Sequence, residues 1–204
     1  MTLAPSDGRV SRGLRTRQTI LDAAIDLLRL EGAAALTHRA IAARAGTSLA
    51  ATTYHFDTLD DLLVAAFEQL TERTVDQVTA ISDAVLRGER GLVDAAVEFA
   101  ETVDPQHGFG ADGLVELAHA SINHERLRVH VGYYVQQMSR PFAALIGEDA
   151  SITLVHAFTG VLMHHRTSVS GTAARAELRA DLTRLFDTFG LTRAVTNRLE
   201  EELS

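Results

Sequence analysis

Residues 36–67 read LTHRAIAARAGTSLAATTYHFDTLDDLLVAAF, and this stretch decides the fold. Three hydroxyl side chains, Thr37, Ser48 and Thr58, each precede a run of helix-forming residues. In that position the hydroxyl oxygen can accept a hydrogen bond from the first turn of a helix. Gly46 separates the first two runs, as expected where one helix ends and a tight turn follows. The pattern therefore predicts two short helices joined by a turn, the layout of a helix-turn-helix.

The residues before this stretch predict one more helix and an arm. Apolar side chains recur at spacings of three and four from Ile20 to Leu28, which indicates a helix that starts near Thr16 and stops at Gly32. Residues 1–13 contain one proline and two glycines and show no such period, so we expect a flexible arm there.

The residues after this stretch predict a larger helical body. A long helix should begin at Leu59 and run towards Leu86, with Asp61 in the capping-box position three residues after Thr58. Apolar periodicity predicts further helices at about 91–103, 112–123, 125–146, 150–169, 173–189 and 192–203. No strand-like alternation persists, so we expect an all-α fold with an arm (1–13), a three-helix head (14–57) and a helical body (58–204).

Charge is distributed unevenly along the chain. Residues 1–56 hold seven arginines and four acidic residues, whereas residues 57–204 carry a net charge of −11, which gives −8 in total. A basic segment on an acidic body suits a head that binds a polyanion such as DNA. An excess of three charges can also arise by chance, so the charge pattern alone does not decide the matter.

Several classes of function are excluded or disfavoured by what the sequence lacks. With no cysteine, the chain can form no disulfide, thiol nucleophile or thiolate-bound zinc site. The histidines of the body form no i, i+4 pair, and no phosphate-binding loop, G-x-S-x-G or H-E-x-x-H motif is present. We therefore expect no metal, no cofactor and no enzymatic activity. The polar start and the absence of an apolar run of roughly 18 residues predict a cytoplasmic protein without a membrane span.

The same stretch resembles the N-terminal part of the TetR family of bacterial repressors. The matching segments, in order and spacing, are IAARAG at 41–46, Ser48, Tyr54-His55-Phe56 and Asp60-Asp61-Leu62-Leu63. Beyond residue 66 only the chain length and the helical body resemble the family. The resemblance implies a homodimer that represses transcription at a palindromic DNA operator and is released by an unidentified small-molecule effector. It also implies that the body, 58–204, serves ligand binding and dimerisation.

The third helix of the head, at about residues 49–56, is the one expected to read DNA. Ala50 and Ala51 are small enough for close approach, while Thr52 and Thr53 offer a hydroxyl or a methyl group that suits thymine. Nearby hydroxyl, imidazole and guanidinium groups can bond phosphates. The predicted DNA contacts are Arg17, Thr37, Arg39, Arg44, Ser48, Ala50, Ala51, Thr52, Thr53, Tyr54 and His55.

Some of these residues have simpler alternative roles. Tyr54 can instead pack between helices, His55 can brace the bend before the next helix, and Arg44 can be a solvated surface charge. Thr37 is expected to cap a helix in either case.

The sequence also departs from the resembled family at three positions of the head. The family often has a basic residue where Leu49 stands, a lysine where Leu59 stands and a tyrosine where Thr53 stands. The side chain of Leu59 should therefore lie beside the DNA backbone without neutralising a phosphate, or else pack inside the head.

The body is expected to hold a dimer interface and a ligand pocket. In the resembled family the last two long helices, here about 150–169 and 173–189, pair with their twins in a four-helix bundle. Their apolar stripes predict an interface of Leu154, Phe158, Val161, Leu162, Leu182 and Phe186. Polar and aromatic residues on the helices expected to surround a pocket predict ligand contacts at Phe99, Phe109, His119, Asn123, Tyr133, Tyr134, Gln137 and His156.

Two other classes of function remain alternatives to a DNA-binding repressor. One is a helical enzyme, against which the absence of catalytic motifs argues. The other is a helical adaptor that binds only proteins, which the missing basic residues at positions 49 and 59 would favour. Binding to the DNA upstream of the gene would distinguish the three.

Overall fold

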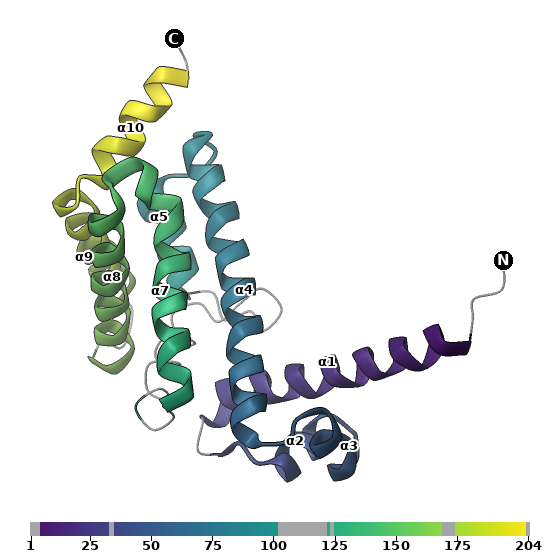
Figure 1. Cartoon of the computed structure of the whole chain (residues 1–204). Helices are drawn as coiled ribbons and strands as arrows, with labels where there is room; N and C mark the ends of the chain where they lie inside the picture. Colours follow the sequence, from purple (N-terminus) through teal and green to yellow (C-terminus); the bar gives the residue numbers. More distant parts are fainter. Residues whose placement is uncertain (1–4, 33–34, 102–121, 123–124, 169–173, 203–204) are drawn as a thin grey trace.

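The computed structural model describes residues 5–32, 35–101, 122, 125–168 and 174–202. Within these ranges every regular element is an α-helix, which confirms the all-α fold class. Figure 1 shows a small head at one end and a larger body, joined by one long helix that runs through both. The helix expected at about 112–123 lies outside the described residues except for Ile122.

The head contains the expected helix-turn-helix. Thr37 and Ser48 cap the second and third helices, because their hydroxyl oxygens accept hydrogen bonds from the N–H groups of Ala40 and Ala51, each at 3.1 Å. These caps fix where both helices begin, and the observed bounds differ from the predicted ones by one residue at the C-terminal ends. The helices of the head are α1 (Pro5–Glu31), α2 (His38–Arg44) and α3 (Leu49–His55).

The first helix is longer than the sequence pattern predicts. α1 begins at Pro5, so the prediction of a flexible arm at 1–13 is wrong for residues 5–13. Proline suits the first position of a helix, where the missing N–H needs no partner. Further along this part of α1, Arg15 donates a hydrogen bond to Ser11 Oγ at 2.8 Å. Figure 1 shows this part of α1 projecting from the molecule, and Leu14 is 64% exposed, which explains why no apolar period marks it.

The long helix α4 (Leu59–Leu86) belongs to the head and the body at once. It starts with the predicted capping box: Thr58 Oγ1 accepts from the Asp61 N–H at 3.1 Å, and the Asp61 carboxylate accepts from the Thr58 N–H at 3.2 Å. Its first half packs against α1, where Asp22 accepts hydrogen bonds from Gln69 at 3.1 Å and Arg73 at 2.7 Å.

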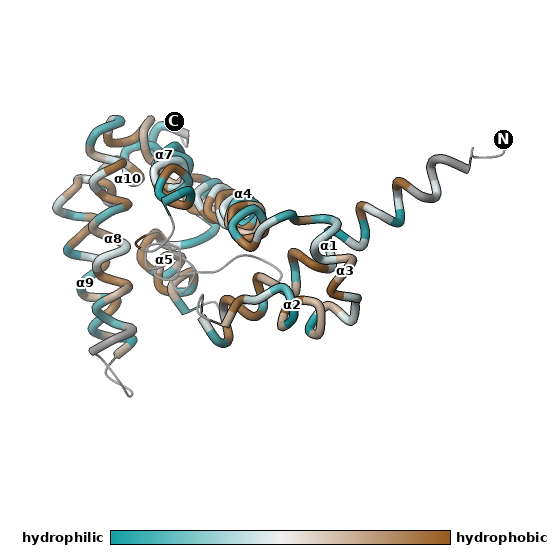
Figure 2. The backbone as a smooth tube through the Cα atoms, turned by 60° about the horizontal axis from the view of Figure 1, so that its bottom comes forward, coloured by the Kyte–Doolittle hydropathy of each residue, from teal (hydrophilic) through white to brown (hydrophobic). Residues whose placement is uncertain are grey.

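The body surrounds the second half of α4. Figure 1 shows α7 beside α4, α8 and α9 in the layer beyond, and α10 at the end far from the head. Figure 2 shows hydrophobic and hydrophilic stretches alternating along each tube, as expected for helices with one face in a core. The bounds are α5 (Leu92–Glu101), α7 (Glu125–Ile146), α8 (Glu148–Ser168), α9 (Ala174–Thr188) and α10 (Leu191–Glu202).

We predict that the capping box of α4 contributes measurably to stability. Thr58→Ala removes the hydroxyl that accepts from Asp61 and should lower the free energy of unfolding by about 1 kcal/mol. Thr58→Ser keeps a hydroxyl at the same place and serves as the matched control. Urea unfolding followed by circular dichroism measures both, and equal stability of the alanine and serine variants would contradict the role given to this cap.

Candidate nucleic-acid interface and ligand cavity

The turn between α2 and α3 sets the orientation of α3. The Thr47 N–H donates to the Ala42 carbonyl at 3.0 Å, and the Gly46 N–H donates to the Ala43 carbonyl at 3.3 Å. Gly46 has φ +62°, a left-handed conformation that glycine adopts without the steric cost other residues incur. The chain can therefore reverse within three residues and present α3 at the surface of the head.

One face of α3 is exposed and carries small and hydroxylated side chains. Ala50, Thr53 and Tyr54 lie on it, and Tyr54 is 83% exposed, so packing between helices is not its role. The Thr53 hydroxyl donates back to the carbonyls of its own helix, to Leu49 and Ala50 at 3.2 Å each. This leaves the Thr53 methyl as the group that can meet a base edge.

The side chain of Thr52 faces the opposite way, which corrects the prediction that it contacts DNA. It is fully buried, and its hydroxyl donates to the Leu49 carbonyl at 2.7 Å. Thr52 lies one helical turn before the buried Phe56, so both belong to the face of α3 that packs in the head. That spacing of four residues is the signal in the sequence that could have assigned Thr52 to the core.

The remaining candidates on α3 are only partly accessible. Ala51 and His55 are half-buried, and the His55 ring contacts the edge of the Tyr54 ring at a centroid distance of 5.2 Å. Ser48 and Thr37 are exposed but already serve as caps, so a phosphate contact by either would be additional to that role.

The three candidate arginines are held differently. Arg44 forms an ion pair with Asp26 at 3.1 Å, and the Arg17 guanidinium lies 4.9 Å from the centre of the Phe56 ring. Arg39 is exposed on α2 and forms no ion pair with any described residue. Arg39 is therefore the cation of this group that can turn to a phosphate without breaking another contact.

Leu59, at the start of α4, is half-buried and packs against the hydrophobic core. Of the two roles open to it from the sequence, the structure supports packing in the head. Leu49, where the family often has a basic residue, is 45% exposed at the start of α3.

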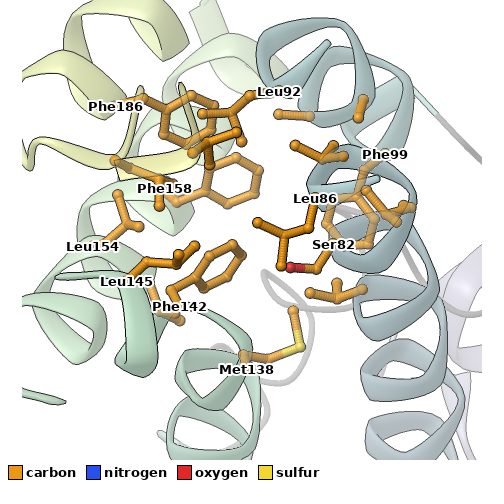
Figure 3. Close-up of a pocket in the computed structure, with 18 residues that line it drawn as sticks. Ser82, Leu86, Leu92, Phe99, Met138, Phe142, Leu145, Leu154, Phe158 and Phe186 are labelled. Carbon is orange, nitrogen blue, oxygen red and sulfur yellow. The ribbon is translucent and has the colours of Figure 1, made fainter. Parts of the chain in front are cut away.

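The body encloses a cavity of about 80 Å³ (Figure 3). A single buried water needs about 10–15 Å³ of such space, so the cavity has room for a small organic molecule. Its described lining is apolar except for Ser82 on α4. The lining residues are Val78, Ile81, Ser82, Val85, Leu86, Leu92, Ala95, Ala96, Phe99, Met138, Phe142, Leu145, Leu154, Val155, Phe158, Phe186, Leu191 and Val195.

The ligand contacts predicted from the sequence have mixed outcomes. Phe99 lines the cavity. Tyr134 lies one turn before the lining residue Met138, and no described residue forms a hydrogen bond with its buried hydroxyl. Burial raises the pKa of Tyr134 above its ordinary range, so its hydroxyl stays protonated and able to donate.

Three other predicted ligand contacts, Tyr133, Gln137 and His156, are not among the described residues that line the cavity. Tyr133 is 48% exposed, because neighbouring residues on a helix point about 100° apart and Tyr134 takes the inner position. Gln137 is half-buried at the surface, where it accepts from Arg140 at 3.1 Å, and His156 is exposed on α8. The predicted contacts Phe109, His119 and Asn123 lie outside the described residues.

Most of the residues predicted to form a dimer interface face the interior of the single chain instead. Leu154, Leu162, Leu182 and Phe186 are buried, and Phe158 and Val161 are half-buried and pack against the same core. The chain's own body covers Leu154, Leu162, Leu182 and Phe186, so the prediction that these four meet a second chain is wrong, while for the half-buried Phe158 and Val161 it stays a prediction. The exposed face of the two helices carries small and polar residues together with the apolar Met163: Thr153, His156, Gly160 and Met163 on α8, and Ala176, Thr183 and Asp187 on α9.

Most cavity residues were not predicted, and the sequence gives no signal for them. Ile81 and Val85 on α4, and Phe142 and Leu145 on α7, show the same apolar periodicity as any core residue. An apolar side chain beside a void is indistinguishable in sequence from one that touches a neighbour.

Polar contacts connect the start of α4 to α7. Arg126 on α7 donates to Asp61 Oδ1 at 2.7 Å, and His130 Nδ1 lies 3.7 Å from Glu68 Oε1. The hydrogen bond from the Thr58 hydroxyl and the bond from Arg126 hold the pKa of Asp61 below its usual value, so this carboxylate stays ionised at neutral pH. The first turn of α4 is thus held by its own cap and by the body.

The part of the chain that the structure describes contains no cluster of three or more potential metal ligands. Among the same residues, no helix is long and apolar enough to cross a membrane.

Comparison with known proteins places these features in context. Residues 20–66 match the family model described as bacterial regulatory proteins, tetR family. The multidrug binding protein EbrR complexed with ethidium is 31% identical, with a TM-score of 0.67 over 83% of this chain and 98% of that chain. A TetR family member from Streptomyces coelicolor A3 is 30% identical, with a TM-score of 0.64 over 83% and 97% of the two chains. A search of curated proteins finds no match.

A fold-level likeness extends to a more distant protein. A TetR transcription regulator from Haloarcula marismortui ATCC 43049 is 23% identical, with a TM-score of 0.66 over 85% of this chain and 97% of that chain.

The two adjacent threonines of α3 provide a matched test of its two faces. Thr53→Ser keeps the hydroxyl and removes only the outward methyl, so stability should not change. A lost contact with a thymine methyl should cost about 0.8 kcal/mol of binding, roughly fourfold. Thr52→Ser removes a buried methyl and should lower the melting temperature without changing base preference.

The measurement combines thermal melting with mobility shifts on DNA in which thymines are replaced by uracils, which lack the methyl group. Uracil should weaken binding of the parent chain and of Thr52→Ser more than it weakens binding of Thr53→Ser, the pattern of a double-mutant cycle. If instead Thr52→Ser lost the preference for thymine and Thr53→Ser lowered the melting temperature, the assignment of Thr53 to the DNA-facing side of α3 would be wrong.

Proposed function

The chain belongs to the TetR family of bacterial regulatory proteins, and from this premise we propose that it is a repressor that binds a palindromic operator as a homodimer and is released by a small molecule. Family membership makes it a DNA-binding transcriptional regulator with a ligand-binding domain, and not an enzyme. The repressor role, the dimer and the release by an effector are the parts that we propose.

The exposed face of α3 is the observation that carries the DNA-binding role. Ser48 caps the helix, Ala50 leaves space for close approach, and Thr53 and Tyr54 extend outward. A recognition helix contacts base edges in the major groove through residues near its N-terminal end. We propose Ala50, Thr53 and Tyr54 as the base-facing group, and Arg39 with the two capped helix starts as the phosphate contacts.

The helices α4 and α7 extend from the cavity to the head. α4 and α7 both line the cavity, with Val85 on the first and Phe142 on the second. Towards the head, the same two helices are joined by the Arg126–Asp61 bond. We propose that an effector spreads these helices and so moves the head, which lowers DNA affinity; by thermodynamic linkage, DNA lowers effector affinity by the same factor.

We place the dimer contact on the outward face of α8 and α9, opposite the cavity. Gly160 is exposed there, and an added Cβ would meet nothing within 4 Å in the single chain. A small residue at this place permits close approach of a second helix. Two-fold dimers are the commonest oligomers, and their symmetry matches that of a palindromic operator. We also propose the boundary between head and body at residues 57 and 58, where α4 begins.

Footprinting on the DNA upstream of the gene tests the function. We expect a protected inverted repeat, with affinity that falls steeply as salt rises because each phosphate contact releases counterions. Arg39→Ala should reduce the slope of log K against log salt by about one for each subunit contact. Absence of any protected site at low salt would contradict the proposal and favour an adaptor that binds only proteins.

The dimer face is tested by a pair of glycine substitutions. Gly160→Arg places a long charged side chain on the proposed interface and should give a monomer that no longer binds the operator. Gly132→Arg is the matched control, because Gly132 is also exposed within a helix, α7, with nothing within 4 Å of an added Cβ. Light scattering and mobility shifts are measured on both. A Gly160→Arg protein that remains dimeric would place the interface elsewhere.

A further inference from the structure

We propose that the cavity of this chain selects an uncharged, largely aromatic molecule and rejects cations of the same size and shape. This inference rests on the proposed function, in which the cavity holds the effector. It goes further by naming the chemical class that the cavity admits.

The lining is the first ground for this proposal. Its described residues include no acidic or basic side chain, and Ser82 supplies their only side-chain hydroxyl. A charge that leaves water for such a site loses its hydration and meets no opposite charge from the described lining, which is far more costly than burial of a neutral group.

The acidic residues on α5, one of the helices that line the cavity, are exposed and already paired. Asp94 on α5 is bound by Arg179, and this contact lowers the pKa of Asp94, which keeps it ionised on the outside. Glu101 is paired with Arg175 at 3.1 Å. Neither carboxylate is among the residues that line the cavity, so neither offers a counter-charge to a bound cation.

The aromatic residues favour a flat ligand. The rings of Phe158 and Phe186 are stacked, with centroids 6.4 Å apart and an angle of 11° between the planes, and Phe99 lies 6.2 Å from Phe158. Figure 3 shows Phe158 and Phe142 on the same side of the cavity, facing Leu86 and Ser82 of α4 across it. Ring faces also attract cations, but that attraction is smaller than the hydration that a fully buried cation loses.

The Ser82 hydroxyl can form a hydrogen bond with a ligand in the cavity. No described residue gives the Ser82 hydroxyl a hydrogen bond, and it lies on the α4 side of the cavity in Figure 3. A ligand with an amine, hydroxyl or carbonyl group can form a hydrogen bond with Ser82.

The test compares two probes with the same three-ring framework. 1-Aminoanthracene is uncharged at neutral pH, whereas proflavin, a diaminoacridine, is a cation. Each is titrated by fluorescence into the full chain without DNA. We expect 1-aminoanthracene to bind at least tenfold more tightly than proflavin.

Variants locate the binding and reverse its preference. Ala96→Phe fills the cavity and should abolish binding of 1-aminoanthracene, while Ala144→Phe, at an exposed position of α7, is the matched control and should leave it unchanged. Ser82→Asp supplies a carboxylate and should raise proflavin affinity at least tenfold while weakening the neutral probe. Ser82→Ala should weaken 1-aminoanthracene only a few-fold.

The outcomes separate the two proposals. Proflavin binding as tight as that of 1-aminoanthracene, and lost in Ala96→Phe, would overturn the charge preference but leave the cavity as the effector site. Failure of both probes to bind, or binding that Ala96→Phe leaves unchanged, would overturn the effector site as well. The comparison on the unmodified chain stands even where a variant fails to fold.

Discussion

One helix fills both ends of a single hydrophobic core, which runs from the head into the body. The first half of α4 buries Leu62 and Phe67 beside α1, and its second half buries Val78 and Val85 in the body. The helix must therefore keep an apolar face over all 28 of its residues, with no break at which the head could move independently. The capping box at its start and the Arg126–Asp61 bond hold the end that meets the head. The positions of α3 and of the cavity both depend on α4.

Helix starts were predictable from the sequence because they depend on short-range chemistry. A hydroxyl before a helical run satisfies N–H groups two or three residues later, so Thr37, Ser48 and Thr58 marked the starts of α2, α3 and α4 correctly. The sequence did not predict the projecting half of α1, because no hydroxyl cap or apolar period marks it. It packs on little, so no apolar period distinguishes it from an arm, and its helix depends on local hydrogen bonds such as that of Arg15 with Ser11.

Which way a side chain faces was harder to predict than where a helix lies. Thr52 and Thr53 are neighbours of identical chemistry, yet one is fully buried and the other exposed. Likewise, the stripe on α8 that includes Leu154 is apolar enough for a dimer interface, but the chain's own body covers it. Periodicity identifies an apolar face without identifying its partner. The cavity adds a second difficulty, because it is defined by the space between side chains from six helices.

The unbroken length of α4 also makes it a lever. At about 1.5 Å of rise per residue, the cavity-lining end and the head end are separated by roughly 30 Å. A tilt of about 5° around the cavity end would then displace the head by roughly 2.5 Å. In a two-fold dimer the rotation axis relates the displacements of the two heads, so the distance between the heads changes by up to twice that amount. The half-sites that the heads must match are spaced about 34 Å apart. In the proposed dimer, a small tilt at the cavity would thereby change the spacing of the heads relative to the pitch of DNA.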